Sequence, residues 1–402
     1  MKYTRYLLMT LSVLFCFLSG CASSVAQDTA PSVIELKPDV VLGMMERVAD
    51  WQLKQYQPEE NIFYDDDSAD GHPQGWVYAA LHVGLSSLAE VSNHDRYQKA
   101  LQIIAKRNRY SFAPRIYNAD DYAIGQLYID LYELDPNPEY LAPLKSIFDI
   151  ILASPSTIDL EFKKAAGVYE VYDERRYSIV PCKNRWCWAD AIFMGPPVWM
   201  HMASITGEKR FLDFADKEFW ETTELLYDKE EHLFYRDTRY FTQREANGAK
   251  IFWGRGNGWV IAGLVRILDH LPVDHPNRSR YESLYKEMAA ALAKAQTTDG
   301  YWRPSLLAPD IFSSPESSGT GFITYGLAWG VNQGLLERSE YLPVISKGWH
   351  SLTRAVHPNG KLGWVQQVAS KPGSASFNDS QLYGVGAFLL AGSQVLELAN
   401  VP

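Results

Sequence analysis

The stretch NRSRYESLYKEMAAALAKAQ, residues 277–296, repeats its apolar side chains with the period of an α-helix. These apolar positions are Tyr281, Leu284, Met288 and Leu292. Residues three or four positions apart lie on one face of a helix, so the stretch predicts a helix with one buried side. The same spacing recurs along most of the 402-residue chain, and long strand-like runs are hard to find. The chain is therefore predicted to be all-α.

The periodic runs and the residues that interrupt them predict twelve helices. They cover roughly residues 39–56, 74–91, 95–106, 120–133, 138–153, 189–205, 208–226, 256–270, 277–296, 318–333, 338–354 and 380–398. Twelve helices in consecutive pairs favour a closed ring of six helical hairpins over a bundle. A helical solenoid stacks hairpins in the same way, although no short fixed-period repeat is visible.

The N-terminus has the layout of an export signal. Lys2 and Arg5 precede an apolar run in MKYTRYLLMTLSVLFCFLSG, residues 1–20, which is too short to span a membrane comfortably. The run ends in Leu-Ser-Gly followed by Cys21, which resembles the bacterial lipoprotein cleavage box. We therefore expect a lipid anchor on Cys21 and a location in the cell envelope. An ordinary signal peptide with an incidental cysteine is the alternative.

With this signal, the chain is expected to divide into three segments. Residues 1–20 are expected to be removed, residues 21–37 to form a flexible tether, and residues 38–402 to form one folded domain. Because Lys2 and Arg5 leave with the signal and no acid does, the formal net charge moves from −10 to −12. A nucleic acid is therefore not an expected partner.

The remaining cysteines and the acidic clusters predict no metal site. Cys182 and Cys187 lack the spacing of a zinc site, and the sequence leaves open whether they form a disulfide. The acidic run at residues 65–70 fails the EF-hand pattern, because Ala69 stands where an oxygen ligand is needed. The scattered histidines, His72, His82, His201 and His232, are expected to be structural.

Two loops combine aromatic and charged residues in an unusual way. The loop WCWADAIFM, residues 186–194, places Asp190 among tryptophans, and FWGRGNGW, residues 252–259, carries three alternate glycines. This glycine spacing is not that of a nucleotide-binding loop, so backbone approach to a ligand lined by Trp253, Arg255 and Trp259 is favoured. The planar fork of Arg255 suits a carboxylate, and a structural salt bridge is the alternative.

Three aspartates are candidates for acid–base chemistry. Asp120 and Asp121 in YNADDYAIGQ open a predicted helix, as Asp190 does, so helix capping is the alternative for all three. Trp186 and Trp188 would exclude water from Asp190, and a second carboxylate across the ring would repel its charge. Both effects favour the protonated form that a general acid needs.

Five motifs in order then make the chain resemble glycoside hydrolase family 105, the unsaturated glycuronyl or rhamnogalacturonyl hydrolases. The motifs are WCWADAIFMGPPVWMHMASITGEKRFLDF, LYDKEEHLFYRDTRYF, FWGRGNGWVIAGL, DGYWRPSLL and SGTGFITYGLAWGVNQGLL. The resemblance runs from about residue 40 to the C-terminus. It implies an (α/α)6 barrel of six helical hairpins and makes residues 38–402 a catalytic domain.

The resemblance also implies roles for particular residues. Asp190 matches the family's catalytic aspartate, and Trp188 matches a wall on which a sugar stacks. Asp120 matches the second aspartate, although Asp121 stays a candidate because many relatives have Asp-His where this chain has Asp-Asp. Lys183 is a looser match to a substrate-binding position.

In the glycine-rich motif, Trp253, Arg255 and Trp259 match substrate-contacting positions. Lys183, Arg185 and Arg255 are expected to make a local positive pocket in an otherwise acidic protein.

The implied reaction acts on the C4=C5 vinyl ether of an unsaturated uronic acid at the non-reducing end of a lyase product. Asp190 would protonate C4 while water adds at C5, and no metal or organic cofactor is needed. The substrate is either of the rhamnogalacturonan type or of the ulvan type, with a uronyl-rhamnose linkage. The alternatives are a saturated-sugar hydrolase or uronate lyase on the same barrel, or a lipoprotein that binds oligosaccharides without cleaving them. The oligomeric state is left open.

Overall fold

The computed structural model describes residues 36–63, 72–163 and 180–401. The expected signal peptide, the anchor at Cys21, nearly all of the tether and the acidic run at residues 65–70 lie outside these ranges. What the sequence predicts for them stays a prediction.

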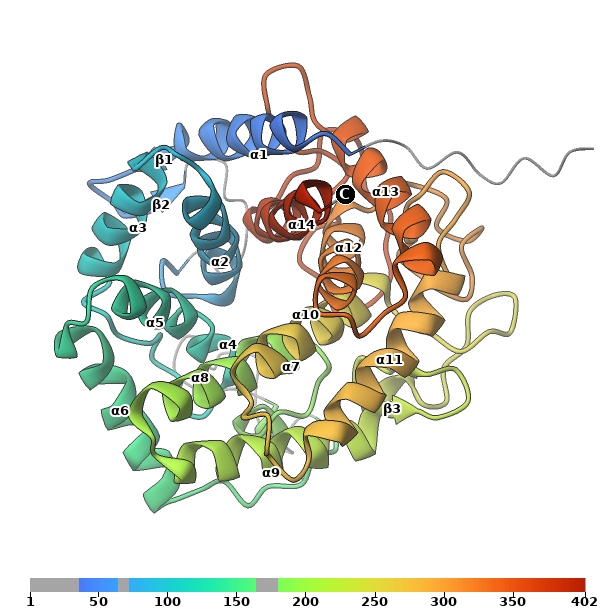
Figure 1. The fold of residues 1–402 in the computed structure, drawn as a ribbon. Helices are drawn as coiled ribbons and strands as arrows, with labels where there is room; N and C mark the ends of the chain where they lie inside the picture. Colours follow the sequence, from blue (N-terminus) through green and yellow to red (C-terminus); the bar gives the residue numbers. More distant parts are fainter. Residues whose placement is uncertain (1–35, 64–71, 164–179, 402) are drawn as a thin grey trace, which may run out of the picture. The chain divides into compact units, whose positions relative to one another are not determined.

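Six helices of the described chain form an inner ring (Figure 1). Each contacts the next, and the last contacts the first, so the ring is closed. In chain order they are α2 (Trp76–Val91), α5 (Gly125–Leu134), α8 (Pro196–Thr206), α10 (Gly254–His270), α12 (Ser317–Asn332) and α14 (Leu382–Asn400).

Six further helices pack around this ring, one before or after each inner helix in the chain (Figure 1). They are α1 (Pro38–Leu53), α3 (Arg96–Arg107), α6 (Pro138–Ala153), α9 (Lys209–Leu226), α11 (Arg278–Lys294) and α13 (Arg338–Arg354). The predicted (α/α)6 barrel is therefore confirmed. A solenoid is excluded, because α14 packs against α2 and leaves no open end.

The short elements lie in the connections. They are the helices α4 (Ala119–Tyr122) and α7 (Ala191–Met194), the 3₁₀ turns η1 (Pro181–Asn184) and η2 (Thr238–Tyr240), and the antiparallel hairpins β1 (Tyr56–Gln57) with β2 (Ile62–Phe63) and β3 (Tyr227–Asp228) with β4 (Leu233–Phe234). The helix predicted at 189–205 is divided into α7 and α8, because Pro196 and Pro197 follow Gly195 and begin a new helix. The helix predicted at 120–133 is likewise divided into α4 and α5.

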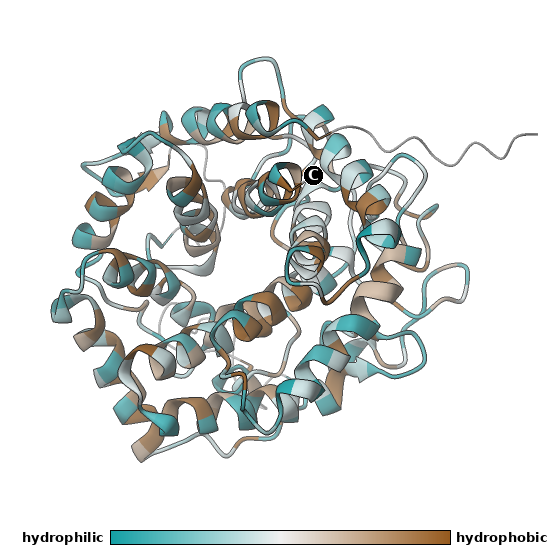
Figure 2. Cartoon of the chain, viewed as in Figure 1, coloured by the Kyte–Doolittle hydropathy of each residue, from teal (hydrophilic) through white to brown (hydrophobic). Residues whose placement is uncertain are grey.

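Hydrophobic side chains fill the space between the two rings. Figure 2 shows hydrophilic residues along the outer side of the outer helices and hydrophobic residues on the sides that face the inner ring. Helices α12 and α14 are buried over almost their whole length. Helix α14 is long and apolar enough to cross a membrane by composition, but most of its residues are covered by neighbouring helices. It is therefore read as a core helix of the barrel.

The inner helices run in the same direction, because the starts of α2, α10 and α14 contact one another while the C-terminal parts of α2, α5, α8, α10 and α14 line a common cavity. Their N-terminal ends consequently gather at one end of the barrel and their C-terminal ends at the other. We call these the N-terminal end and the C-terminal end of the barrel. The contacts described below place the sequence-predicted site residues at the N-terminal end.

Helices α2 and α14 meet through two glycines. A Cβ atom added to Gly84 of α2 would lie 2.5 Å from the carbonyl oxygen of Gly386 on α14, a distance that real Cβ contacts do not reach. The limiting atoms belong to the main chain of Gly386 rather than to a flexible side chain, so the contact cannot widen unless one of the helices moves. The ring closes at this point only because neither residue has a side chain.

We expect Gly84→Ala to lower the free energy of unfolding by about 1–3 kcal/mol, because the added methyl group must push two helices apart. Gly43→Ala in α1 is the matched control, since nothing lies within 4 Å of a Cβ atom there. Alanine at that position should stabilise by up to about 1 kcal/mol through helix propensity. Urea unfolding measures both, and equal effects would show that the α2–α14 contact is not tight.

Candidate active site

Asp190 lies directly before α7, at the N-terminal end of the barrel. Its side chain makes no capping hydrogen bond, so the helix-cap alternative does not describe it. Instead, Oδ2 of Asp190 accepts a hydrogen bond from Nε of Arg236 at 3.2 Å. Only 9% of Asp190 is exposed. The expected setting of tryptophans and a second acid therefore also contains a buried cation.

Arg236 follows β4 and faces three carboxylates. Its second ion pair is with Asp237, at 2.8 Å. Burial alone lowers the pKa of Arg236, but the charges of Asp190, Asp237 and then Asp120 together raise that pKa above its usual value. Asp120 and Asp190 thus act on the same guanidinium, and the structure brings the two predicted aspartates into one electrostatic cluster.

Asp120 and Asp121 are adjacent in sequence but have different partners. Asn118 caps α4 by accepting a hydrogen bond from the backbone N–H of Asp120, so the Asp120 side chain does not serve as the cap. Oδ2 of Asp120 lies 3.9 Å from Nζ of Lys183. Asp121 is turned to Arg115, whose backbone N–H and Nε donate to it at 2.7 and 2.9 Å. Burial raises the pKa of Asp121, and Arg115 only partly reverses this effect.

Lys183 lies between Asp120 and Trp188. Its Nζ is 5.2 Å from the centre of the Trp188 ring, within range of a cation–π contact. Trp188 is almost fully buried. A disulfide between Cys182 and Cys187 closes the loop that carries Lys183, which answers the question that the sequence left open.

Arg185, on the same loop, does not contribute to a positive pocket as expected. Its guanidinium is paired with Glu218 at 2.9 Å and with Glu221 on α9. These two carboxylates neutralise the charge of Arg185, so the expectation that Arg185 contributes to a positive pocket was wrong.

Trp253 and Arg255 begin α10 and hold one neighbouring segment of chain. Nε1 of Trp253 donates to the side chain of Gln366 at 2.9 Å. The two terminal nitrogens of Arg255 donate to the backbone carbonyls of Gln366 and Gln367, at 2.6 and 2.9 Å. The guanidinium also lies 4.8 Å from the centre of the Tyr383 ring.

The fork of Arg255 is therefore directed at main chain. Among the described residues it forms no salt bridge, which removes the alternative considered from the sequence. That Arg255 contacts a substrate carboxylate stays a prediction. In this structure it positions residues 366–367 against the start of α10.

Trp259 belongs to a layer of aromatic rings that joins three parts of the barrel. Its ring centre lies 4.9 Å from Phe193 of α7, 4.1 Å from Phe322 of α12 and 6.0 Å from Trp76 of α2. Because Trp259 is only 1% exposed, its role in this structure is to pack the start of α10 against α2, α7 and α12. Its predicted contact with substrate stays untested.

Sequence reasoning missed Arg236 and Asp237, which belong to the cluster around Asp190, and Gln366, which accepts hydrogen bonds from Trp253 and Arg255. The Arg-Asp pair directly follows the apolar run Leu-Phe-Tyr at residues 233–235, whose first two residues form β4, and no role was predicted for charges placed there. That pattern was the available signal. Gln366 lies in a long connection without periodicity, and no sequence pattern points to it.

We expect Asp121→Ala to lower the free energy of unfolding by about 1–3 kcal/mol, because it removes the acceptor for the backbone N–H and Nε of Arg115. Asp121→Asn is the matched control and should cost much less, since an amide oxygen still accepts from Arg115 and burial already opposes the charge of Asp121. Urea unfolding of both variants measures this. Equal losses would show that the charge of Asp121, rather than its acceptor oxygens, stabilises this turn.

Comparison with known proteins gives the family. The family model described as Glycosyl Hydrolase Family 88 matches residues 44–399. An unsaturated 3S-rhamnoglycuronyl hydrolase from Alteromonas sp. (strain LOR) is 39% identical over 355 residues, which cover 87% of this chain and 84% of the relative.

Two solved structures are similar over nearly their whole length, each with 28% sequence identity and a TM-score of 0.76. One is a glycosyl hydrolase family 88 protein from Bacteroides vulgatus, and the match covers 90% of this chain and 99% of that one. The other is described as a polysaccharide lyase, and the match covers 91% of this chain and 99% of that one. The family match spans almost all of the described barrel, so this chain belongs to glycosyl hydrolase family 88 and is a glycoside hydrolase.

Proposed function

We propose that this protein removes the 4,5-unsaturated uronic acid from the non-reducing end of oligosaccharides made by polysaccharide lyases. The observation that carries the proposal is the cluster at the N-terminal end, where Asp190 pairs with Arg236 and Asp120 faces Lys183. A carboxylic acid provides the proton that the reaction needs, and the two cations suit an anionic sugar. The name of the Alteromonas relative supports this substrate class.

The reaction begins with proton transfer from Asp190 to C4 of the vinyl ether. Water adds at C5, and the proton that it releases returns to the carboxylate of Asp190, so the net change is the addition of one water molecule. The resulting hemiketal opens and releases the next sugar as its leaving group. This chemistry differs from ordinary glycoside hydrolysis, in which two carboxylates act at the anomeric carbon.

Arg236 is placed to meet the carboxylate of the unsaturated sugar. Its buried guanidinium already pairs with Asp190, so a sugar carboxylate that binds Arg236 would lie beside the proposed proton donor. Asp237, which is fully buried, holds Arg236 in place through a second ion pair.

For the substrate we propose a uronyl-rhamnose linkage of the ulvan type ahead of the rhamnogalacturonan type. The name of the 39% identical relative supports this order. We also retain family 105 as the finer assignment, on the five sequence motifs. A panel of lyase-generated oligosaccharides from both polymers tests the order, and faster release from the pectic substrates would reverse it.

A uronate lyase is the second candidate, because one of the two similar structures is titled a polysaccharide lyase. Ultraviolet absorbance separates the two reactions. The proposed hydrolase consumes the conjugated uronate and the signal falls, whereas a lyase creates that group and the signal rises. A rise with intact polymer would replace the proposal.

We further propose that the protein is exported and anchored through Cys21. The disulfide between Cys182 and Cys187 supports an oxidising compartment such as the cell envelope.

Asp190→Asn should lower kcat by roughly 10²–10⁴-fold, because an amide cannot donate the proton. Folding should be intact, because the amide oxygen of asparagine still accepts from Arg236 and Arg236 keeps its ion pair with Asp237. Asp120→Asn should lower kcat less, and Asp213→Asn on the exposed face of α9 is the control for removing an unrelated carboxylate. Initial rates on an unsaturated disaccharide, with thermal melts, measure all three. Near-wild-type kcat in Asp190→Asn would make Asp120 the first alternative donor.

Cys21→Ser should move the protein from the membrane fraction to the soluble fraction, because serine cannot accept the thioether-linked lipid. Fractionation of cells that express the full chain measures this change. A variant that remains in the membrane as strongly as the wild type would show that Cys21 carries no anchor.

A further inference from the structure

The C-terminal end of the barrel contains a cavity of about 610 Å³, opposite the cluster around Asp190. Its walls come from the C-terminal parts of α2, α5, α8, α10 and α14, together with Tyr325 of α12. Among the described residues that line it, five are acidic, two are histidines and one is an arginine. The proposed hydrolysis uses none of them.

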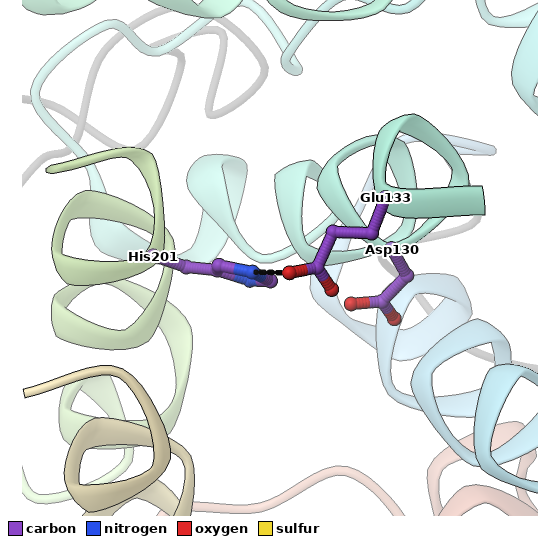
Figure 3. A group of neighbouring side chains, drawn as sticks. All are labelled: Asp130, Glu133 and His201. Atoms are coloured by element: carbon purple, nitrogen blue, oxygen red, sulfur yellow. Dashed lines mark ion pairs between the residues drawn. The ribbon is translucent and has the colours of Figure 1, made fainter. Parts of the chain in front are cut away.

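Three of these side chains converge on one point (Figure 3). Asp130 and Glu133 are one helical turn apart on α5, so both project from the same face. His201 points toward them from α8. One ligand atom from each residue, a carboxylate oxygen or an imidazole nitrogen, lies within 4.8 Å of the other two.

The orientation of His201 is an independent observation. The residue is 2% exposed, and its Nε2 makes no hydrogen bond to any part of the chain that the structure describes. Nε2 lies 3.0 Å from Oε1 of Glu133, an ion-pair distance without hydrogen-bond geometry (Figure 3). The ring stacks on His270, with centres 3.5 Å apart, and this contact holds Nε2 toward the two carboxylates.

The lining of the cavity is also rich in acids. Arg266 pairs with Asp130 at 3.4 Å, but it is the one arginine beside five carboxylates among the described lining residues. A cavity with this excess of carboxylates suits a bound cation.

We propose that Asp130, Glu133 and His201 bind a divalent transition-metal ion such as Zn²⁺, with water from the cavity completing its coordination. Imidazole with carboxylates suits zinc, whereas calcium and magnesium prefer oxygen ligands alone. Ligand atoms around a tetrahedral zinc ion are about 3.4 Å apart, so separations of up to 4.8 Å must contract and the 3.0 Å pair of His201 and Glu133 must widen slightly. Glu133 is 53% exposed at its side chain and is able to make that movement.

The ion would join α5 to α8 across the C-terminal end of the barrel. Its role is structural, because the proposed proton donor lies at the opposite end. This proposal does not depend on which sugar the protein cleaves.

Isothermal titration of metal-free, tag-free protein with ZnCl₂, and separately with MgCl₂, tests the site. We expect saturable binding of one zinc ion per chain, a higher Tm with zinc, and no comparable binding of magnesium. Loss of an outer partner already weakens metal sites by about 10–100-fold, so Glu133→Gln and Asp130→Asn should each cost at least about tenfold in affinity. Neither substitution leaves a cavity, so both variants should fold.

Glu397→Gln is the matched control. This residue lines the same cavity and loses the same charge, but it is not one of the three proposed ligands. Its zinc affinity should change by less than about threefold, because only long-range attraction is lost. An equal loss of zinc affinity in Glu397→Gln and Glu133→Gln would show that the negative charge of the cavity attracts cations without a defined binding site. Absence of saturable zinc binding in the wild type would leave only an ion pair between His201 and Glu133.

Discussion

The close contact between α2 and α14 is the constraint on which the rest of the structure depends. The first and last inner helices meet through Gly84 and Gly386, so the ring closes without side chains between the two backbones. Only a closed ring brings the starts of α2, α10 and α14 together. Trp76 and Trp259 of the aromatic layer, together with Tyr383, lie at that junction. Arg255 of α10 contacts the Tyr383 ring.

At the N-terminal end, Asp190 forms an ion pair with Arg236, and Asp120 lies near Lys183. The two cations come from different loops, and the charge of Asp120 also acts on Arg236. The Arg236 side is deeply buried and held by Asp237, whereas Lys183 is more exposed and is carried on a loop closed by a disulfide. One side of the cluster is therefore rigid, and the other is better placed to adapt to a ligand.

Much of this architecture was predictable from periodicity alone. The runs of apolar residues located all the long helices, because each must bury one face, and only the divisions near Pro196 and Ala123 were missed. The candidate site was harder to predict. The choice between Asp120 and Asp121 depends on where Arg115 and Lys183 lie, and the partner of Asp190 is 46 positions away at Arg236. Such long-range pairings leave no local pattern. The cluster of Asp130, Glu133 and His201 was missed for the same reason.

The parallel direction of the six inner helices gives the barrel an electrical polarity of its own. Each helix carries a dipole equivalent to roughly half a positive charge at its N-terminus and half a negative charge at its C-terminus. Along the barrel axis these six dipoles favour anions at one end and cations at the other, and the antiparallel outer helices, which lie farther from the axis, reduce this preference without reversing it there. The backbone thus has the same preference as the side chains: a uronate suits the end with Arg236 and Lys183, and a metal ion suits the end with Asp130 and Glu133.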